Sequence, residues 1–230
     1  MRDSIAAYRA DIANAARETD DFDARHGTET GVSVFPWDAA LSREEQAQAI
    51  VYMASDQPTF REMLCATGLA DEDFPGYVFV DIGAGKGRVA LMAAEYPFES
   101  VVGLELSLPL IEQAQSNVER CHGLARRCAT LRFAHGNAAR FLFPHRPLVL
   151  YFYHPFTVAT MKVVMANLVS SLRAFPREAY ILYRQPLFGR KYPDDCLAAQ
   201  GVFRKIAEQA GCRQDLRNPW TVWHHSPSLL

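Results

Sequence analysis

The sequence lacks the features that mark several special classes of protein. No apolar run is long enough to cross a membrane, and the N-terminus predicts a polar helix instead of a secretory leader. The five cysteines are widely spaced without a C-x-x-C pair, which argues against a disulfide framework or a zinc cluster. Neither sign of charge dominates, because 24 basic and 26 acidic residues leave a net charge of -2. We therefore expect a cytoplasmic protein that binds neither a membrane nor duplex nucleic acid.

The 230 residues, 49% of them hydrophobic, are enough for one sizeable α/β domain. From residue 77 onward, short apolar runs alternate with helical patterns, which predicts parallel strands joined by helices. Together with a closing antiparallel pair, they predict a mostly parallel, seven-stranded sheet with helices on both faces. The predicted strands are 77–82, 100–106, 129–135, 148–153 and 179–183, and the predicted helices are 87–95, 107–121 and 158–175.

Regions on either side of this pattern are less regular. We interpret residues 1–70 as an N-terminal helical extension or lid packed on a core of residues 71–230. A capping box at Ser42 and Glu45 supports one of its helices, and the turn-rich residues 20–35 could fold over a ligand. The remaining predicted elements are helices over 2–18, 42–54, 57–67 and 197–210, and an antiparallel pair of 212–216 with 220–224.

A glycine-rich loop joins the first predicted strand of the core to its helix. The string D-I-G-A-G-K-G begins at Asp81, and its glycines permit close approach of a ligand to the backbone. The helix beyond it offers unpaired N–H groups. A dinucleotide fingerprint requires glycine where this chain has Arg88. Asp81 would repel a pyrophosphate but suits a ligand with an ammonium group, so the loop favours an adenosyl cofactor.

Polar residues end the next two predicted strands. Glu105 closes the second strand, where a carboxylate can accept hydrogen bonds from both hydroxyls of a ribose. The third strand runs into H-G-N-A, which includes Asn137. A polar residue at that point can meet the amino group of an adenine, although a simple turn explains the same letters. The glycine loop and Glu105, one strand apart, favour one nucleoside site.

The fourth predicted strand ends in Tyr153-His154-Pro155-Phe156, at the edge where α/β sheets bind ligands. His154 is the candidate general base, because the unperturbed pKa of histidine lies near neutrality. Tyr153 could hydrogen-bond the methyl acceptor or pack on a sulfonium. The alternative for His154 is a histidine that caps the next helix.

Two further groups of residues have a plainer interpretation. The adjacent His224 and His225 have no partners at metal-ligand spacing, so we predict no metal site. The neighbouring Trp220 and Trp223 are typical of core packing on an edge strand.

The residues from Tyr77 to Ser107 resemble motifs I and II of class I S-adenosylmethionine-dependent methyltransferases. The strings D-I-G-A-G-K-G-R and V-V-G-L-E-L-S resemble, more narrowly, bacterial relatives of the histone-lysine methyltransferases of telomeric silencing. Those relatives often carry Y-N-P-F where this chain has Tyr153-His154-Pro155-Phe156. They also carry a tyrosine-led segment before the first strand, which residues 52–55 match in part.

This resemblance covers residues 50–185 and implies a Rossmann-like class I fold with S-adenosylmethionine as cofactor. It implies very little about the substrate, because the bacterial members are diverse. The predicted catalytic residues are His154 and Tyr153. The predicted cofactor-binding residues are Asp81, Gly83, Ala84, Gly85, Gly87, Glu105, Leu106, Asn137, Ala138 and Tyr153, to which the resemblance adds Tyr52 and Ser55.

The function predicted from these residues is transfer of a methyl group from S-adenosylmethionine to a nitrogen or oxygen of a small molecule or peptide, leaving S-adenosylhomocysteine. Two alternatives stay open. One is an accessory protein that binds the cofactor without catalysis, which the histidine at position 154 allows. The other is an NAD(P)-dependent oxidoreductase, which Arg88 and Asp81 disfavour.

Overall fold

The structure, a computed structural model, describes residues 21–185, 193–211 and 218–229. The predicted helix over 2–18 and the predicted strand over 212–216 lie outside these residues. None of the described helices combines the length and the apolar character needed to cross a bilayer.

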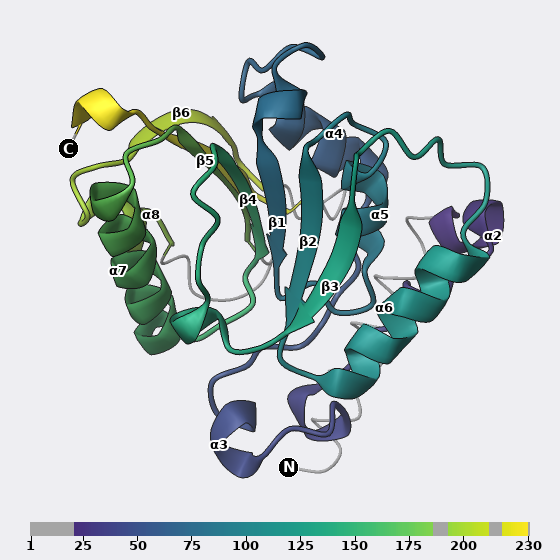
Figure 1. The fold of residues 1–230 in the computed structure, drawn as a ribbon. Coiled ribbons are helices and arrows are strands. Elements are labelled where there is room, and N and C mark those ends of the chain that lie inside the picture. The colour runs from purple at the N-terminus through teal and green to yellow at the C-terminus, as the bar shows by residue number, and fades with distance from the viewer. Residues whose placement is uncertain (1–20, 186–192, 212–217, 230) are drawn as a thin grey trace.

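A seven-stranded sheet in the order β3-β2-β1-β4-β5-β7-β6 forms the centre of the protein (Figure 1). β1 to β5 are parallel, and β7 runs antiparallel to both β5 and β6. All five residues of β1 are buried, as expected of a parallel strand covered on both faces. The strands are β1 (Val78–Ile82), β2 (Ser100–Glu105), β3 (Leu131–His135), β4 (Leu148–Tyr153), β5 (Ala179–Arg184), β6 (Arg204–Gln209) and β7 (Trp220–His225).

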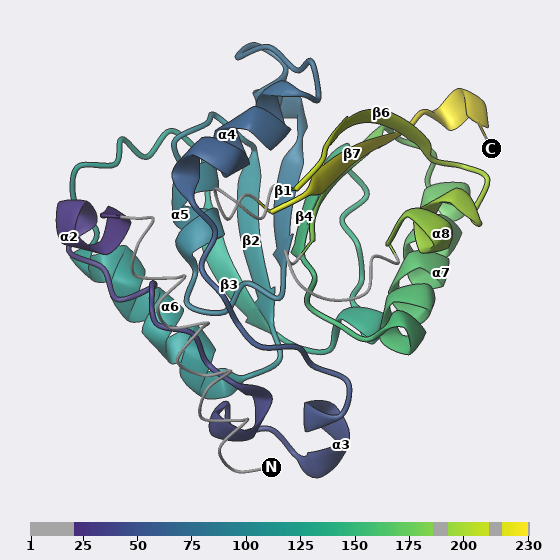
Figure 2. The same ribbon diagram turned by 180° about the vertical axis from the view of Figure 1, so that it is seen from behind.

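Helices cover both faces of the sheet. α7 and α8 pack on one face, α4 and α5 on the other, and α6 runs beside β3 (Figure 2). The α-helices are α2 (Phe22–His26), α3 (Arg43–Gln46), α4 (Gln57–Cys65), α5 (Arg88–Ala93), α6 (Leu108–Arg120), α7 (Val158–Ala174) and α8 (Pro193–Ala198). Short 3-10 turns lie at η1 (Pro36–Asp38), η2 (Phe74–Gly76), η3 (Ala138–Arg140) and η4 (Pro227–Leu229). The predicted α/β fold with a mostly parallel, seven-stranded sheet is confirmed.

The predicted helix over 42–54 is wrong beyond its first turn. The capping box of Ser42 and Glu45 is present, but α3 ends at Gln46. The chain then runs extended, and single bridges pair Tyr52 with Val34 and Ala49 with Phe156. These tertiary pairings outweigh the weak helical preference of the segment.

The predicted helix over 197–210 is also wrong. α8 ends at Ala198, Gly201 turns the chain with a φ of 67°, and the next residues form β6. β6 pairs with β7, so the predicted edge position of β7 is wrong too. The burial of β7 confirms the core packing expected of Trp220 and Trp223. This segment is a strand because it pairs with the edge of β7 that β5 does not occupy. Its own residue pattern does not indicate that pairing.

Candidate functional site

A pocket of about 860 Å³, its open mouth included, lies where β1, β2 and β4 end. It is lined by Gly83 after β1, Glu105 of β2 and Tyr153 of β4. A smaller pocket of about 240 Å³ adjoins it and shares Tyr52, Gly83 and Tyr153 among its lining residues.

The glycine loop after β1 is built around the ring of Tyr52. Gly83, Gly85 and Gly87 have φ values of 81°, 51° and 84°, a region that residues with a side chain rarely adopt. A Cβ atom on Gly85 would lie 2.1 Å from ring carbons of Tyr52. A Cβ atom on Gly83 would lie 2.8 Å from Cβ of Pro155. The loop needs glycine both for its conformation and for the side chains packed against it.

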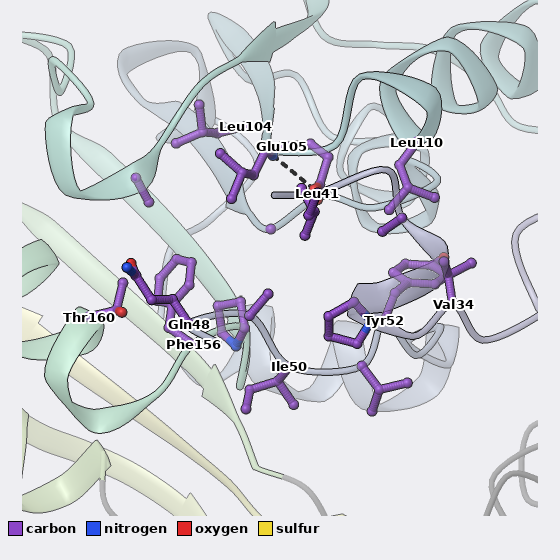
Figure 3. Close-up of a pocket in the computed structure, with 18 of the residues that line it drawn as sticks. Val34, Leu41, Gln48, Ile50, Tyr52, Leu104, Glu105, Leu110, Phe156 and Thr160 are labelled. Atoms are coloured by element: carbon purple, nitrogen blue, oxygen red, sulfur yellow. Dashed lines mark hydrogen bonds between the residues drawn. The ribbon is translucent and has the colours of Figure 1, made fainter. Parts of the chain in front are cut away.

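The backbone holds the Glu105 carboxylate in place at the end of β2. It accepts hydrogen bonds from the N–H groups of Gly85 (2.8 Å), Leu106 (2.8 Å) and Ser107 (2.9 Å). Figure 3 shows Glu105 and Leu104 together on one side of the larger pocket. Burial raises the pKa of Glu105, while the three N–H groups favour its charged form. The carboxylate is therefore oriented before any ligand arrives.

Asp81 lines the smaller pocket from β1 and is 3% exposed. Burial, together with the nearby charge of Glu105, raises its pKa to about 8. A cation in the smaller pocket would favour the ionised carboxylate. The electrostatics thus suit a positively charged ligand.

The H-G-N-A segment after β3 is both a turn and a part of the pocket wall. The side-chain oxygen of Asn137 accepts a hydrogen bond from the N–H of Ala139 (2.9 Å) and caps η3. Asn137 and Ala138 also line the larger pocket. The two interpretations of this segment are compatible.

Tyr153 and His154 face opposite sides of the sheet. Tyr153 lines both pockets, whereas His154 lines neither. His154 has a φ of 42°, and its Nδ1 lies 2.9 Å from the hydroxyl oxygen of Tyr183 on the α7 face. Burial lowers the pKa of His154 to about 4, which makes it a weak proton acceptor at neutral pH.

The segment of residues 34–53 forms the outer wall of the larger pocket, and Tyr52 is the one member of it among the predicted site residues. The N–H of Ile50 donates to the carbonyl of Pro155 (3.2 Å), and the N–H of Thr157 donates to the carbonyl of Gln48 (3.1 Å). Gln48 and Phe156 lie together at one end of the pocket, and Tyr52 lies at the other (Figure 3). No local motif marks such a wall, because it is defined by backbone pairing with the loop after β4. Its lining residues are Val34, Pro36, Ala39, Leu41, Gln48, Ala49, Ile50, Val51, Tyr52 and Met53.

Lys86 of the glycine loop and Arg88 at the start of α5 hold the segment that leads into this wall. Lys86 Nζ donates to the carbonyl of Val32 (2.8 Å), and Arg88 Nε donates to the hydroxyl of Thr30 (2.5 Å). The guanidinium of Arg88 also lies 3.3 Å from the carboxylate of Asp23. Hydrogen bonds from Thr30 and its neighbours outweigh burial and lower the pKa of Asp23 to about 2. The Asp23 carboxylate is therefore ionised at neutral pH.

Most of the predicted cofactor-binding residues meet around these two pockets. Gly85 and Gly87 do not line either one; Gly85 orients Glu105, and Gly87 is the N-cap of α5. Ser55 was assigned by resemblance and lies 2.7 Å from the hydroxyl of Tyr151 in the smaller pocket. The predicted residues that line a pocket are Tyr52, Ser55, Asp81, Gly83, Ala84, Glu105, Leu106, Asn137, Ala138 and Tyr153.

Comparison with known proteins supports this picture. Residues 79–174, from β1 to the end of α7, match a family model described as a methyltransferase domain. A search of curated proteins finds no match. Two solved structures are similar in fold. Magnesium protoporphyrin IX methyltransferase from Synechocystis PCC 6803, with bound S-adenosylmethionine, has a TM-score of 0.54 and 16% identity over 74% of this chain and 79% of its own. The glycopeptide N-methyltransferase MtfA has a TM-score of 0.53 and 14% identity over 76% of this chain and 92% of its own.

The fold is that of class I methyltransferases, and the matched domain is a methyltransferase domain. The match to a methyltransferase domain over residues 79–174 bears out the predicted enzyme class, and structures of similar fold contain bound S-adenosylmethionine or S-adenosylhomocysteine, which supports the predicted cofactor. The antiparallel β7 between β5 and β6 also departs from the strand order of dinucleotide-binding sheets. The comparisons do not reach the narrower relation to the telomeric-silencing enzymes, which stays a prediction.

Proposed function

We propose that this protein transfers the methyl group of S-adenosylmethionine to a nitrogen or oxygen atom of a small molecule or peptide. One observation carries the proposal. The Glu105 carboxylate is held by three backbone N–H groups at the wall of the larger pocket, one strand away from the glycine loop. A fixed carboxylate beside a glycine loop suits the ribose of an adenosyl cofactor. The adenine and the methionyl group of that cofactor extend from the ribose in opposite directions.

The residues present fit this cofactor. Glu105 would accept hydrogen bonds from the ribose hydroxyls, and Leu106, Asn137 and Ala138 would enclose the adenine. The methionyl end would enter the smaller pocket, where Asp81 favours its ammonium group. The ring of Tyr52, which belongs to the outer wall, would cover the glycine loop.

When bound, the cofactor supplies an electrophilic methyl group on sulfur. The chain has to align the acceptor with it, and alignment alone can supply a large part of the rate. Tyr153 borders both pockets, so we assign it the positioning of the acceptor. His154 as general base stays a prediction, and its place on the α7 face favours a structural role.

Calorimetry with S-adenosylhomocysteine and with NADH tests the proposed cofactor. We expect saturable binding of the first ligand and none of the second. Glu105→Gln should weaken binding of S-adenosylhomocysteine by roughly tenfold to a hundredfold, because hydrogen bonds to a charged group are lost. Binding of NADH in its place would overturn the assignment.

Transfer of a radiolabelled methyl group to candidate acceptors separates an enzyme from an accessory protein. The place of His154 outside both pockets is the observation that keeps the accessory function as a second candidate. Tight binding of S-adenosylhomocysteine without transfer to small molecules or peptides would favour that candidate.

A further inference from the structure

Three side chains lie side by side at the ends of β4 and β5 and the start of β7. Tyr153 is in register with Arg184, and Arg184 is in register with Trp220. Directly paired residues of neighbouring strands project from the same face of a sheet. The three side chains therefore share the face on which α4 packs, while His154 lies on the other.

The guanidinium of Arg184 is buried but only partly hydrogen-bonded. Arg184 is 6% exposed, and its Nη2 lies 2.6 Å from a carboxylate oxygen of Asp56. Its central carbon lies 4.6 Å from the centre of the Tyr153 ring. Nε and Nη1 have no hydrogen-bond partner in the part of the chain that the structure describes. One ion pair thus leaves N–H groups on two nitrogens of this guanidinium unused.

Trp220 has the same property. It is 7% exposed, and its indole Nε1 is buried without a hydrogen-bond partner among the described residues. All of the unpartnered atoms on Arg184 and Trp220 are donors. Buried donors are almost always paired in folded proteins, because an unpaired one keeps the full cost of its lost hydration. A ligand that relieves this cost has to bring acceptor oxygens.

This donor cluster lies beside the part of the sheet edge that the proposed cofactor occupies, where we expect the methyl acceptor to bind. The proposed cofactor contacts occupy the ends of β1, β2 and β3, at the glycine loop, Glu105 and Asn137. Tyr153 lines both pockets with its side chain, and Arg184 packs against its ring. The ends of β4 and β5 and the start of β7 are the part of the sheet edge that those contacts do not use.

We propose that Arg184 and Trp220 form a subsite that binds a carboxylate of the methyl acceptor, so that the substrate is a carboxylic acid. The inference rests on the proposed methyltransferase function. A carboxylate carries acceptors only, and its bonds to a guanidinium are charge-assisted and stronger than those of a neutral carbonyl. A lysine ammonium would bring further donors to a cluster of donors. The donor cluster therefore favours a carboxylate over a lysine side chain as its ligand.

Indole N–H signals in ¹⁵N-correlated NMR spectra test the subsite. The chain has three tryptophans, and Trp220→Phe assigns the signal of Trp220. The protein, saturated with S-adenosylhomocysteine, is titrated with acetate, propionate and benzoate, and separately with acetamide, propionamide and benzamide. We expect a saturable downfield shift of the Trp220 signal with at least one carboxylate, and binding of the matched amide about tenfold weaker or less.

Two pairs of variants sharpen the result. Arg184→Lys should weaken carboxylate binding by roughly tenfold or more, because the unpaired donors are lost. Arg177→Lys is its control, since Arg177 is also buried but donates to the carbonyls of Ser171, in the last turn of α7, and of Phe175, just after it. In calorimetry, which does not need the Trp220 signal, Trp220→Phe should weaken binding, whereas Trp223→Phe should not, because the Trp223 indole already donates to Thr221.

Two outcomes would overturn the subsite. They are no saturable shift with any of the three carboxylates, or equal binding of carboxylates and amides. Failure of the proposed function would be seen separately, because the unmodified protein would then not bind S-adenosylhomocysteine. A protein that binds S-adenosylhomocysteine but not carboxylates is therefore a methyltransferase candidate with another class of acceptor.

Discussion

The two halves of the sheet's carboxyl edge are built in different ways. At the ends of β1, β2 and β3, glycines, backbone N–H groups and one carboxylate form the wall of the pocket. At the ends of β4 and β5 and the start of β7, the polar groups are side chains contributed by distant parts of the chain. A site made from backbone needs a fixed local string of residues, whereas a site made from side chains needs only a meeting of strands. The first kind is visible as a motif, and the second is not.

Gly85→Ala is expected to have the largest effect on the half built from backbone. The new methyl group would meet Tyr52, and alanine at a φ of 51° costs about 1–2 kcal/mol before any clash. Because the loop also orients Glu105, we expect binding of S-adenosylhomocysteine to fall at least tenfold in calorimetry. Gly68→Ala is the matched control, since Gly68 has a φ of 75° and open space around it. Equal binding by the two variants would show that the Tyr52 contact is unimportant.

His154→Ala tests whether the end of β4 supplies a base. A general base predicts a loss of turnover of about a hundredfold or more. His154 contacts Tyr183 and lies on the α7 face, so we expect His154→Asn to lower turnover by less than about tenfold. Asparagine is chosen because it tolerates the positive φ of this position. Cofactor binding should stay near that of the unmodified protein in both variants. A hundredfold loss of turnover in a folded His154→Asn variant would instead support His154 as the general base.

Asp81→Asn should change the pH dependence of stability. The pKa of Asp81 in the folded protein, about 8, lies above the ordinary value, so the folded state binds the proton more tightly than the unfolded state. This contribution to stability is present at low pH and is lost as the pH rises through about 8. Measured without ligand, the Tm of the variant relative to the unmodified protein should rise by a few degrees between pH 6 and pH 9. A constant difference would contradict a raised pKa.

Tyr52→Phe should have the smallest effect. The variant keeps the ring over Gly85 and loses the hydrogen bonds of the tyrosine hydroxyl, to the carbonyl of Thr30 (2.8 Å) and with the backbone of Lys86. We expect a loss of about 1 kcal/mol, which corresponds to a fall in Tm of roughly 2–4 °C for a chain of this size. Affinity for S-adenosylhomocysteine should change less than in Gly85→Ala. A larger loss of affinity would show that the hydroxyl itself, or the wall it holds, takes part in binding.

Much of the core was predictable because its signals are local. The apolar run over 148–153 coincides with β4, and the strand, glycine loop and helix around Asp81 follow one another in the expected order. Glu105 could be assigned because parallel strands bring their carboxyl ends to one edge. Tyr52 and Ser55 were placed by resemblance, and both lie against the smaller pocket.

The errors arose where a distant partner decided the conformation. Residues 47–54 have a helical composition after a real capping box, but pairing with Val34 and with the loop after β4 holds them extended. β6 carries an apolar spacing compatible with a helix, and only β7 makes it a strand. Weak intrinsic preferences lose to hydrogen bonds that complete a sheet.

The sequence by itself determined the order of strands and helices from β1 to β5, the glycine loop with Asp81, and Glu105 one strand later. Each of these depends on residues close together in the chain, since backbone conformation and hydrophobic periodicity are local properties. Only the tertiary structure decided that His154 turns away from the pockets, that residues 34–53 wall the larger one, and that Arg184 meets Trp220 and Asp56. Those arrangements depend on strand register and on which face of the sheet each side chain takes.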